Sequence, residues 1–269
     1  MTTLDRANAE TPNGLVSIEI CVDSAASALA AARGGAARVE LCANLLEGGT
    51  TPSAGLIELV RAKISVGLQV MIRPRGGDFC YTAEEFETMR RDILVAKRLE
   101  ADGVVLGLLH PDGRVDIQRT RQLVELARPL NVTFHRGFDV SAGLFRALED
   151  ICTVGADRLL TSGAEPTALE GAAMIAKVAA AGHGRISIMA GGGIRPHNAA
   201  RIIEQTGVRE IHAGLKRRVA SPMTYRNPKA SLRTMPGSEY PRFQVLEEDV
   251  RNLSRAAAMA RLDVSARIV

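Results

Sequence analysis

Residues 17–42 read SIEICVDSAASALAAARGGAARVELC and contain the unit from which the fold is built. A short apolar run at 17–22 comes first, and an alanine-rich segment follows it. This segment is a predicted helix, which should stop at the glycine pair Gly34 and Gly35. A second apolar run at 38–42 comes next. The stretch therefore predicts two parallel strands joined by a helix.

The same alternation of apolar runs and helical stretches continues along the chain. The eight runs lie at 17–22, 38–42, 68–73, 103–109, 131–136, 157–162, 185–190 and 209–214. Several carry apolar residues at nearly every position, as parallel strands do when both faces of the sheet are covered. Eight such units in 269 residues predict an α/β protein with a (β/α)₈ TIM-like barrel and a C-terminal extension. An open doubly wound sheet is the alternative, but no Gly-x-Gly-x-x-Gly follows the first strand, which disfavours a dinucleotide-binding version.

Helix signals lie between the predicted strands. An apolar stripe at helical spacing runs through residues 83–99. Two residue pairs have the spacing of a capping box at predicted helix starts, namely Thr82 with Glu85 and Thr167 with Glu170.

The chain is expected to form one barrel domain over residues 15–269. Residues 1–14 are polar and small, and they predict a flexible N-terminal tail. Residues 215–244 lose the periodic pattern and contain several prolines and arginines, which predicts a long basic loop after the eighth strand. An amphipathic C-terminal helix over about 244–261 is expected to close the structure.

Composition disfavours several classes of protein. The 34 Lys and Arg residues against 30 Asp and Glu give a net charge of +4 without a basic block, so we expect no nucleic-acid partner. No apolar run approaches the ~20 residues that span a bilayer, so we expect no membrane segment. The first residues lack the apolar core of a signal peptide, and four cysteines are too few for a disulfide scaffold. These features predict a cytoplasmic protein with free thiols.

Carboxylates and thiols occur together in the first two predicted strands. Residues two apart in a strand share a face, so Glu19 lies beside Cys21 and Glu40 beside Cys42. The two strands are neighbours in a barrel, which would bring two carboxylates close to two thiols. The carboxylates could be structural partners of buried arginines, and the thiols could be core-packing residues. The alternative is that the four side chains form a functional centre.

Cationic and glycine residues cluster at the ends of the later strands, where barrel enzymes build their active sites. The candidates for binding an anionic ligand are Arg73, Arg75, Arg136, Gly191, Gly192, Gly193 and His212. Two of the arginines flank a proline before a double glycine, which suits a rigid anion-binding corner. The triple glycine runs into a predicted helix, and backbone amides in that position bind phosphate or carboxylate. His135 ends the fifth strand and is a candidate general acid or base, together with Glu19 and Glu40.

Three functions remain open on these residues. Thiolates of Cys21 and Cys42 on neighbouring strands could bind the soft ion Cu(I). A structural zinc site needs four ligands in short spacings such as Cys-x-x-Cys, and none occurs. The second hypothesis is an enzyme that acts on a small anionic or phosphorylated metabolite. The third is an oligomeric scaffold that meets a partner through the basic loop at 215–244.

Six segments match one known family in fixed order. They are EICVDS at 19–24, ELCANLLEGGTTPS at 40–53, MIRPRGGDF at 71–79, TFHRGFD at 133–139, LTSG at 160–163 and GGGI at 191–194. On these segments the chain closely resembles the CutC family of copper homeostasis proteins. The resemblance implies a (β/α)₈-like barrel, a cytoplasmic location and a homo-oligomer of two or more copies. It also implies Cu(I) binding, with Cys21 and Cys42 as the ligands.

One segment departs from the family pattern. After the eighth strand the family has His-x-Ser-x-Arg, whereas residues 212–216 read HAGLK. The hydroxyl is absent, with Gly214 in its place, and Lys216 replaces the arginine. A lysine cannot keep the bidentate anion contact that an arginine makes. Any site at the eighth strand therefore differs in its chemistry from that of the family.

Overall fold

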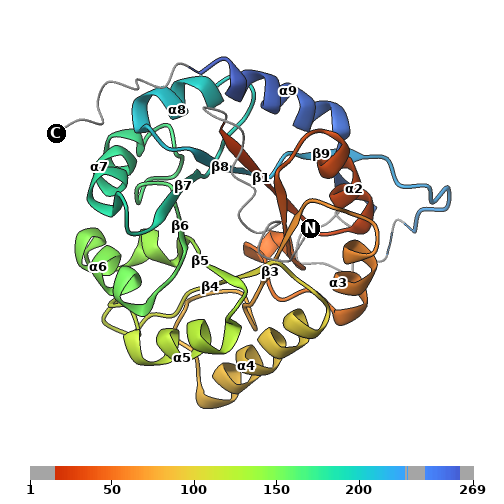
Figure 1. Ribbon diagram of the computed structural model, residues 1–269. Coiled ribbons are helices and arrows are strands. Elements are labelled where there is room, and N and C mark those ends of the chain that lie inside the picture. The colour runs from red at the N-terminus through yellow and green to blue at the C-terminus, as the bar shows by residue number, and fades with distance from the viewer. Residues whose placement is uncertain (1–15, 228, 230–239, 261–269) are drawn as a thin grey trace.

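The computed structural model describes residues 16–227, 229 and 240–260. Figure 1 shows a ring of strands at the centre with helices around it. The strands form a closed parallel barrel in chain order, and the last strand pairs with the first. The predicted TIM-like barrel with a C-terminal extension is confirmed, and the open doubly wound sheet is excluded. The predicted tail at 1–14 lies outside the described residues.

Each of the eight predicted runs overlaps a barrel strand. The strands are β1 (Ser17–Val22), β2 (Arg38–Leu41), β3 (Gly67–Met71), β4 (Gly103–Leu106), β5 (Asn131–Phe134), β6 (Arg158–Thr161), β7 (Ser187–Gly191) and β8 (Glu210–Ala213). Several runs extend past the end of their strand. Residues such as Arg73 and His135 therefore lie at the start of the loops that follow, on the face where a barrel places its site.

Helices connect the strands and cover the outside of the barrel (Figure 1). They are α2 (Ala25–Arg33), α3 (Ala54–Arg61), α4 (Ala83–Arg98), α5 (Ile117–Ala127), α6 (Leu144–Val154), α7 (Ala172–Gly182) and α8 (Ala199–Thr206), with the 3₁₀ turns η1 (Leu45–Glu47) and η2 (Arg136–Val140). Helix α2 ends directly before Gly34, as the glycine pair predicted.

The two predicted capping pairs both form, but only one of them starts a helix. Thr82 and Glu85 exchange hydrogen bonds at the start of α4. Thr167 and Glu170 do the same, yet turns follow them and α7 starts only at Ala172. The predicted helix start at Thr167 was therefore wrong. A capping box closes a single turn, and the residues after it decide whether a helix propagates.

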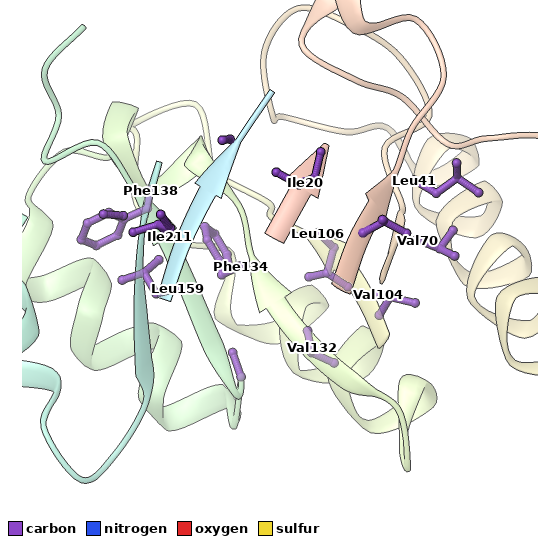
Figure 2. Close-up of a cluster of buried hydrophobic side chains, with 14 of the residues drawn as sticks. Ile20, Leu41, Val70, Val104, Leu106, Val132, Phe134, Phe138, Leu159 and Ile211 are labelled. Carbon is purple, nitrogen blue, oxygen red and sulfur yellow. The ribbon is translucent and has the colours of Figure 1, made fainter. Parts of the chain in front are cut away.

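The apolar core lies between the barrel and the helices. The strand side chains that point away from the barrel axis are aliphatic or aromatic, and Figure 2 shows several of them, including Ile20, Leu41, Val70, Val132 and Phe134. All five are at most 1% exposed. They pack with apolar residues of the surrounding helices in one continuous cluster. Burial of this cluster supplies the main favourable free energy for folding.

The side chains inside the barrel include an ionic layer, which we define as Glu19, Arg38, Arg158 and Glu210. Arg38 Nε donates to Glu19 Oε2 at 2.6 Å, and its Nη2 donates to Glu210. Arg158 Nε donates to the same Glu210 carboxylate at 2.5 Å. The four side chains are at most 14% exposed. Two buried cations thus balance two buried anions, and four strands far apart in sequence are tied together.

Two short strands lie in the segment that was predicted to be a basic loop. β9 (Lys216–Val219) and β10 (Arg242–Val245) pair antiparallel and form a separate two-stranded sheet. Each strand has four residues, and most of them are exposed, so no apolar period marks the strands in the sequence. Contacts distant in sequence hold the pair in place, since the N–H of Val245 donates to Ser27 Oγ of α2 at 3.2 Å.

The C-terminal helix α9 spans Glu247–Ala258 and is shorter than predicted. The first two residues of the predicted range belong to β10, and Arg261 lies outside the described residues. Helix α9 packs on α2 and α8 and buries Val250, Leu253 and Ala257. Among the described residues, no helix is long and apolar enough to cross a membrane.

Replacing Arg38 with methionine is expected to lower the free energy of unfolding by about 3–5 kcal/mol, because two buried carboxylates lose a shared counter-ion. The matched control is Arg217→Met, which removes an exposed arginine paired with Asp249 and should cost at most about 1 kcal/mol. Urea unfolding followed by circular dichroism measures both losses. Equal losses in the two variants would contradict the structural role given to the ionic layer.

Candidate functional site

A cavity of about 520 Å³ opens at the C-terminal ends of the barrel strands, and we call it the barrel-mouth cavity. The predicted site residues in its lining are Cys21, Glu40, Arg73, His135, Arg136, Gly192, Gly193 and His212. Glu19 and Cys42 are fully buried and contact the lining through His212 and Cys21. Arg75 and Gly191 do not line the cavity. The structure therefore brings together ten of the twelve predicted residues.

The two cysteines of the neighbouring strands β1 and β2 are in contact. The Sγ atoms of Cys21 and Cys42 are 3.8 Å apart. Cys21 is 9% exposed and lines the cavity, whereas Cys42 is fully buried behind it. Met71 of β3 and Val105 of β4 pack against the pair. Three sulfur atoms, from β1, β3 and the residue directly after β2, thus share one small buried cluster inside the barrel.

His212 of β8 links the cysteine pair to the ionic layer. Its Nδ1 is 2.8 Å from Glu19 Oε1, and its Nε2 is 3.8 Å from Glu40 Oε2. Glu19 is itself bound by Arg38 on its other carboxylate oxygen. Glu40 Oε2 also lies 3.5 Å from the Sγ atom of Cys42. A continuous row of polar groups therefore runs from Arg38 to the floor of the cavity.

The neighbours of the two cysteines separate their protonation states. A hydrogen bond from the Cys42 thiol, together with a hydrogen bond and positive charge from His212, outweighs burial and lowers the pKa of Cys21 to about 5. The hydrogen bond to Cys21 and burial raise the pKa of Cys42 well above its usual value. At neutral pH the pair therefore holds one thiolate, at Cys21, and one thiol, at Cys42.

The pKa values of the two glutamates, Glu19 and Glu40, also differ. Burial alone would raise the pKa of Glu19, but the charge of Arg38 and the contacts of His212 lower it to about 2. Burial and the nearby Cys21 thiolate raise the pKa of Glu40 well above its usual value. Burial would lower the pKa of His212, yet the charge of Glu40 and the bonds to Cys21 and Glu19 raise it well above the usual value. His212 is therefore an imidazolium held between anionic groups.

His135 is the second histidine of the cavity and is uncharged. Burial and the positive charge of Arg73 lower its pKa to about 3. Its Nδ1 accepts a hydrogen bond from the N–H of Gly137 at 3.0 Å, so the ring proton of the neutral form lies on Nε2. That Nε2 has no hydrogen-bond partner within the described residues. The ring packs against Phe79 with centroids 4.8 Å apart.

The two arginines of the Arg-Pro-Arg segment have different surroundings. Arg73 is 5% exposed, and its guanidinium donates to the carbonyl oxygens of Glu47, Gly49 and Gly77 at 2.6–2.9 Å. It ties the loops after β2 and β3 together and places a positive charge in the cavity wall. Arg75 instead pairs with carboxylates outside the cavity. The corner predicted from this segment therefore contributes one arginine to the cavity.

On the opposite wall, Arg136 is held by two acceptors. Its Nε donates to Asp139 at 2.7 Å and its Nη2 to Ser162 Oγ at 2.6 Å. Gly192 and Gly193 follow β7 with φ of +109° and +69°, a region that favours glycine. Gly191 is buried within the strand itself.

Ten lining residues were missed as site candidates, and three of them carry a sulfur atom or a positive charge: Met71, Arg195 and Lys216. Met71 lies two residues before Arg73, so the alternation along β3 could have placed it on the same face. Lys216 was noted only as a departure from a family pattern. No signal in the sequence pointed to Arg195, because its position depends on how the loop after β7 turns.

The comparisons with known proteins agree on one family. The model of the CutC family matches residues 16–217. The human protein named copper homeostasis protein cutC homolog is 46% identical over 82% of this chain and 80% of its own length. A Chromobacterium violaceum family protein CutC is 47% identical over 89% of this chain and 97% of its own.

A solved structure agrees with this result. The crystal structure of a copper homeostasis protein CutC from Streptococcus agalactiae superposes with a TM-score of 0.70 at 33% identity. The superposition covers 74% of this chain and 98% of the other. The family model matches most of the chain, two relatives are more than 45% identical, and the solved structure has the same barrel. This chain therefore belongs to the CutC family.

Proposed function

We propose that this protein binds Cu(I) through Cys21 and Cys42 in a copper homeostasis role. The contact that carries the proposal is the 3.8 Å separation of the two Sγ atoms on neighbouring strands. Metal–thiolate bonds of about 2.3 Å place two sulfurs at most about 4.6 Å apart, so a small rotation of either side chain suffices. The names of the human and mouse relatives support the role.

The surroundings of the pair favour a soft monovalent ion. Thiolate and thioether sulfur are the ligands that select Cu(I), and Met71 adds a thioether beside the two cysteines. The fourth donor group within reach is Glu40, which is buried and holds its proton more tightly than usual. The ion would enter through the barrel-mouth cavity, since Cys21 lines it and Cys42 lies behind.

The chain is further proposed to act as a cytoplasmic homo-oligomer. Support comes from family membership and from four free cysteines, which suit a reducing compartment. No segment of the described chain is assigned to the contact between copies.

A Cu(I) titration of the reduced protein against a competing chelator tests the copper proposal. We expect one equivalent to bind, and we expect the Cys21→Ser, Cys42→Ser double variant to lose this binding, because both sulfur ligands are gone. The matched control is Cys80→Ser with Cys152→Ser, which removes the two free cysteines outside the cavity. Binding that survives in the first variant would contradict the proposal.

The pH dependence of alkylation tests whether Cys21 is a thiolate at neutral pH. Since its pKa is lowered to about 5, its reaction with iodoacetamide should keep its full rate down to about pH 6 and halve near pH 5. The His212→Gln variant should move this midpoint upward, because a hydrogen bond and a positive charge are lost. Mass spectrometry of the modified peptide, with Cys21→Ser as control, measures the rate. A midpoint near the pKa of a free cysteine would contradict the assignment.

A second candidate function is an enzyme acting on a small anionic or phosphorylated metabolite. One observation favours it: the Glu19–His212 pair orients an imidazolium toward Cys21 and Glu40 at the floor of a cavity large enough for a metabolite. An imidazolium aligned by a carboxylate beside a thiolate is an arrangement used for nucleophilic and acid–base catalysis. Glu40, with its raised pKa, would serve as the general acid.

A metabolite panel tests the enzyme candidate. Phosphorylated and carboxylated metabolites are incubated with the protein, and their consumption is followed by proton NMR. We expect turnover of at least one compound and a loss of about 10²-fold or more in Glu40→Gln, since an amide cannot transfer the proton. Arg75→Gln is the control outside the cavity. A panel left unchanged by the wild-type protein would count against this candidate, and full turnover in Glu40→Gln would contradict the role of that residue.

A further inference from the structure

One wall of the barrel-mouth cavity is built differently from the cysteine side. Its residues come from the loops after β5, β7 and β8 and from the start of β9, and they are Arg136, Gly192, Gly193, Arg195, Gly214 and Lys216. None of these residues belongs to the sulfur cluster or to the groups of side chains that could hold a metal ion among the described residues. Copper binding therefore does not explain this wall, which we call the basic wall.

Glycine lets the main chain approach the arginine on this wall. A Cβ atom at Gly192 would stand 3.1 Å from Ser162 Cβ and 3.6 Å from Arg136 Nη1. Arg136 uses Nε and Nη2 for Asp139 and Ser162, so Nη1 is the nitrogen that faces the glycine loop. Within the described chain, no acceptor is found for the N–H groups of Gly192 and Gly193. Main-chain and guanidinium donors thus stand side by side without an acceptor.

The cavity has an excess of positive charge. Its lining contains three arginines and one lysine against two carboxylates, Glu40 and Glu47. Arg136 has a carboxylate partner, but no ion pair is found for Arg73, Arg195 or Lys216 within the part of the chain that the structure describes. Cations that face one cavity repel each other, and an anion between them relieves the repulsion.

A buried group without a partner gives independent support. Arg73 lines the same cavity, is 5% exposed, and its Nε has no hydrogen-bond partner within the described residues. A buried charged donor without an acceptor is costly, and a bound anion or a water that bridges to it removes that cost.

We propose that the basic wall binds the phosphate group of a small phosphate monoester. A phosphate accepts several hydrogen bonds at once and carries up to two negative charges, which suits paired main-chain N–H groups flanked by Arg136, Arg195 and Lys216. Loops after the seventh and eighth strands are also where barrels commonly hold phosphate. The cavity volume of about 520 Å³ leaves room for an organic part beside the phosphate.

The position of the wall sets where the rest of the ligand lies. His212 lies in β8 and Lys216 is the first residue of β9, and β8 pairs with β1, which carries Cys21. A phosphate on the basic wall therefore directs its organic part toward Cys21 and Glu40. This consequence deepens the enzyme candidate and rests on it, whereas phosphate binding itself requires neither turnover nor copper.

Equilibrium binding measured by calorimetry tests the proposal with two probes, inorganic phosphate and glycerol 3-phosphate, at fixed ionic strength set with chloride. We expect one saturable site. A lower Kd for glycerol 3-phosphate than for inorganic phosphate would identify a phosphorylated metabolite as the ligand. Equal Kd values would identify free phosphate as the ligand. Both outcomes support a phosphate site on the basic wall. Binding that is unsaturable, or that disappears when chloride keeps the ionic strength constant, would overturn it.

Two matched double variants distinguish a specific phosphate site from non-specific electrostatic attraction of phosphate to a basic protein. Arg195→Gln with Lys216→Gln should raise the phosphate Kd by about tenfold or more. Arg201→Gln with Arg209→Gln removes the same charge from exposed positions outside the cavity and should change it less than about twofold. Equal effects of the two pairs would overturn the proposal.

A third variant leaves the charge unchanged. Gly192→Ala should abolish phosphate binding, because its Cβ would enter the space between Ser162 and Arg136. Circular dichroism and an unchanged Cu(I) titration confirm that the barrel remains folded. Wild-type phosphate affinity in a folded Gly192→Ala protein would contradict the site. If the protein binds phosphate but turns over no metabolite, the phosphate site stands and the enzyme candidate fails. If the protein binds no Cu(I), the phosphate site and the enzyme candidate are both unaffected.

Discussion

The carboxylate of Glu19 is the group on which the rest of the site depends. It is fully buried, and its two oxygens bind different partners, Arg38 on one side and His212 on the other. An unpaired carboxylate at this depth would be too costly to keep, so both partners must be present in the folded barrel. The same residue therefore joins the ionic layer that fixes the strands to the imidazolium that keeps Cys21 a thiolate.

This arrangement explains why the barrel interior carries chemistry. The two faces of each strand are used separately: Ile18, Ile20 and Val22 belong to the apolar cluster under the helices, whereas Glu19 and Cys21 face inward. Stability comes mainly from the outer face, through burial of aliphatic side chains. The inner face is then free to hold charged and sulfur-bearing groups that would be poor core residues by themselves.

The sequence was sufficient for the barrel because eight apolar runs and their glycine stops are local patterns. It was also sufficient for the contact between Cys21 and Cys42, since strand alternation and strand order together place both on one side of neighbouring strands. It was insufficient wherever loops decide the outcome. Arg73 turns inward to bind carbonyl oxygens while Arg75 pairs outward, and the two are equivalent in the sequence. The pairing of β9 with β10 and the position of Arg195 depend likewise on distant contacts, which no local pattern encodes.

The small sheet of β9 and β10 has one further consequence. Among the described residues, each of its two strands has one edge without a neighbouring strand, and such edges can recruit strands of other chains. Lys216, Arg217 and Arg218 in β9 and Arg242 in β10 place four positive charges along these eight residues, three of them consecutive. Like charges brought into register would repel a second copy. The basic residues of this segment therefore disfavour strand pairing between copies at these two edges.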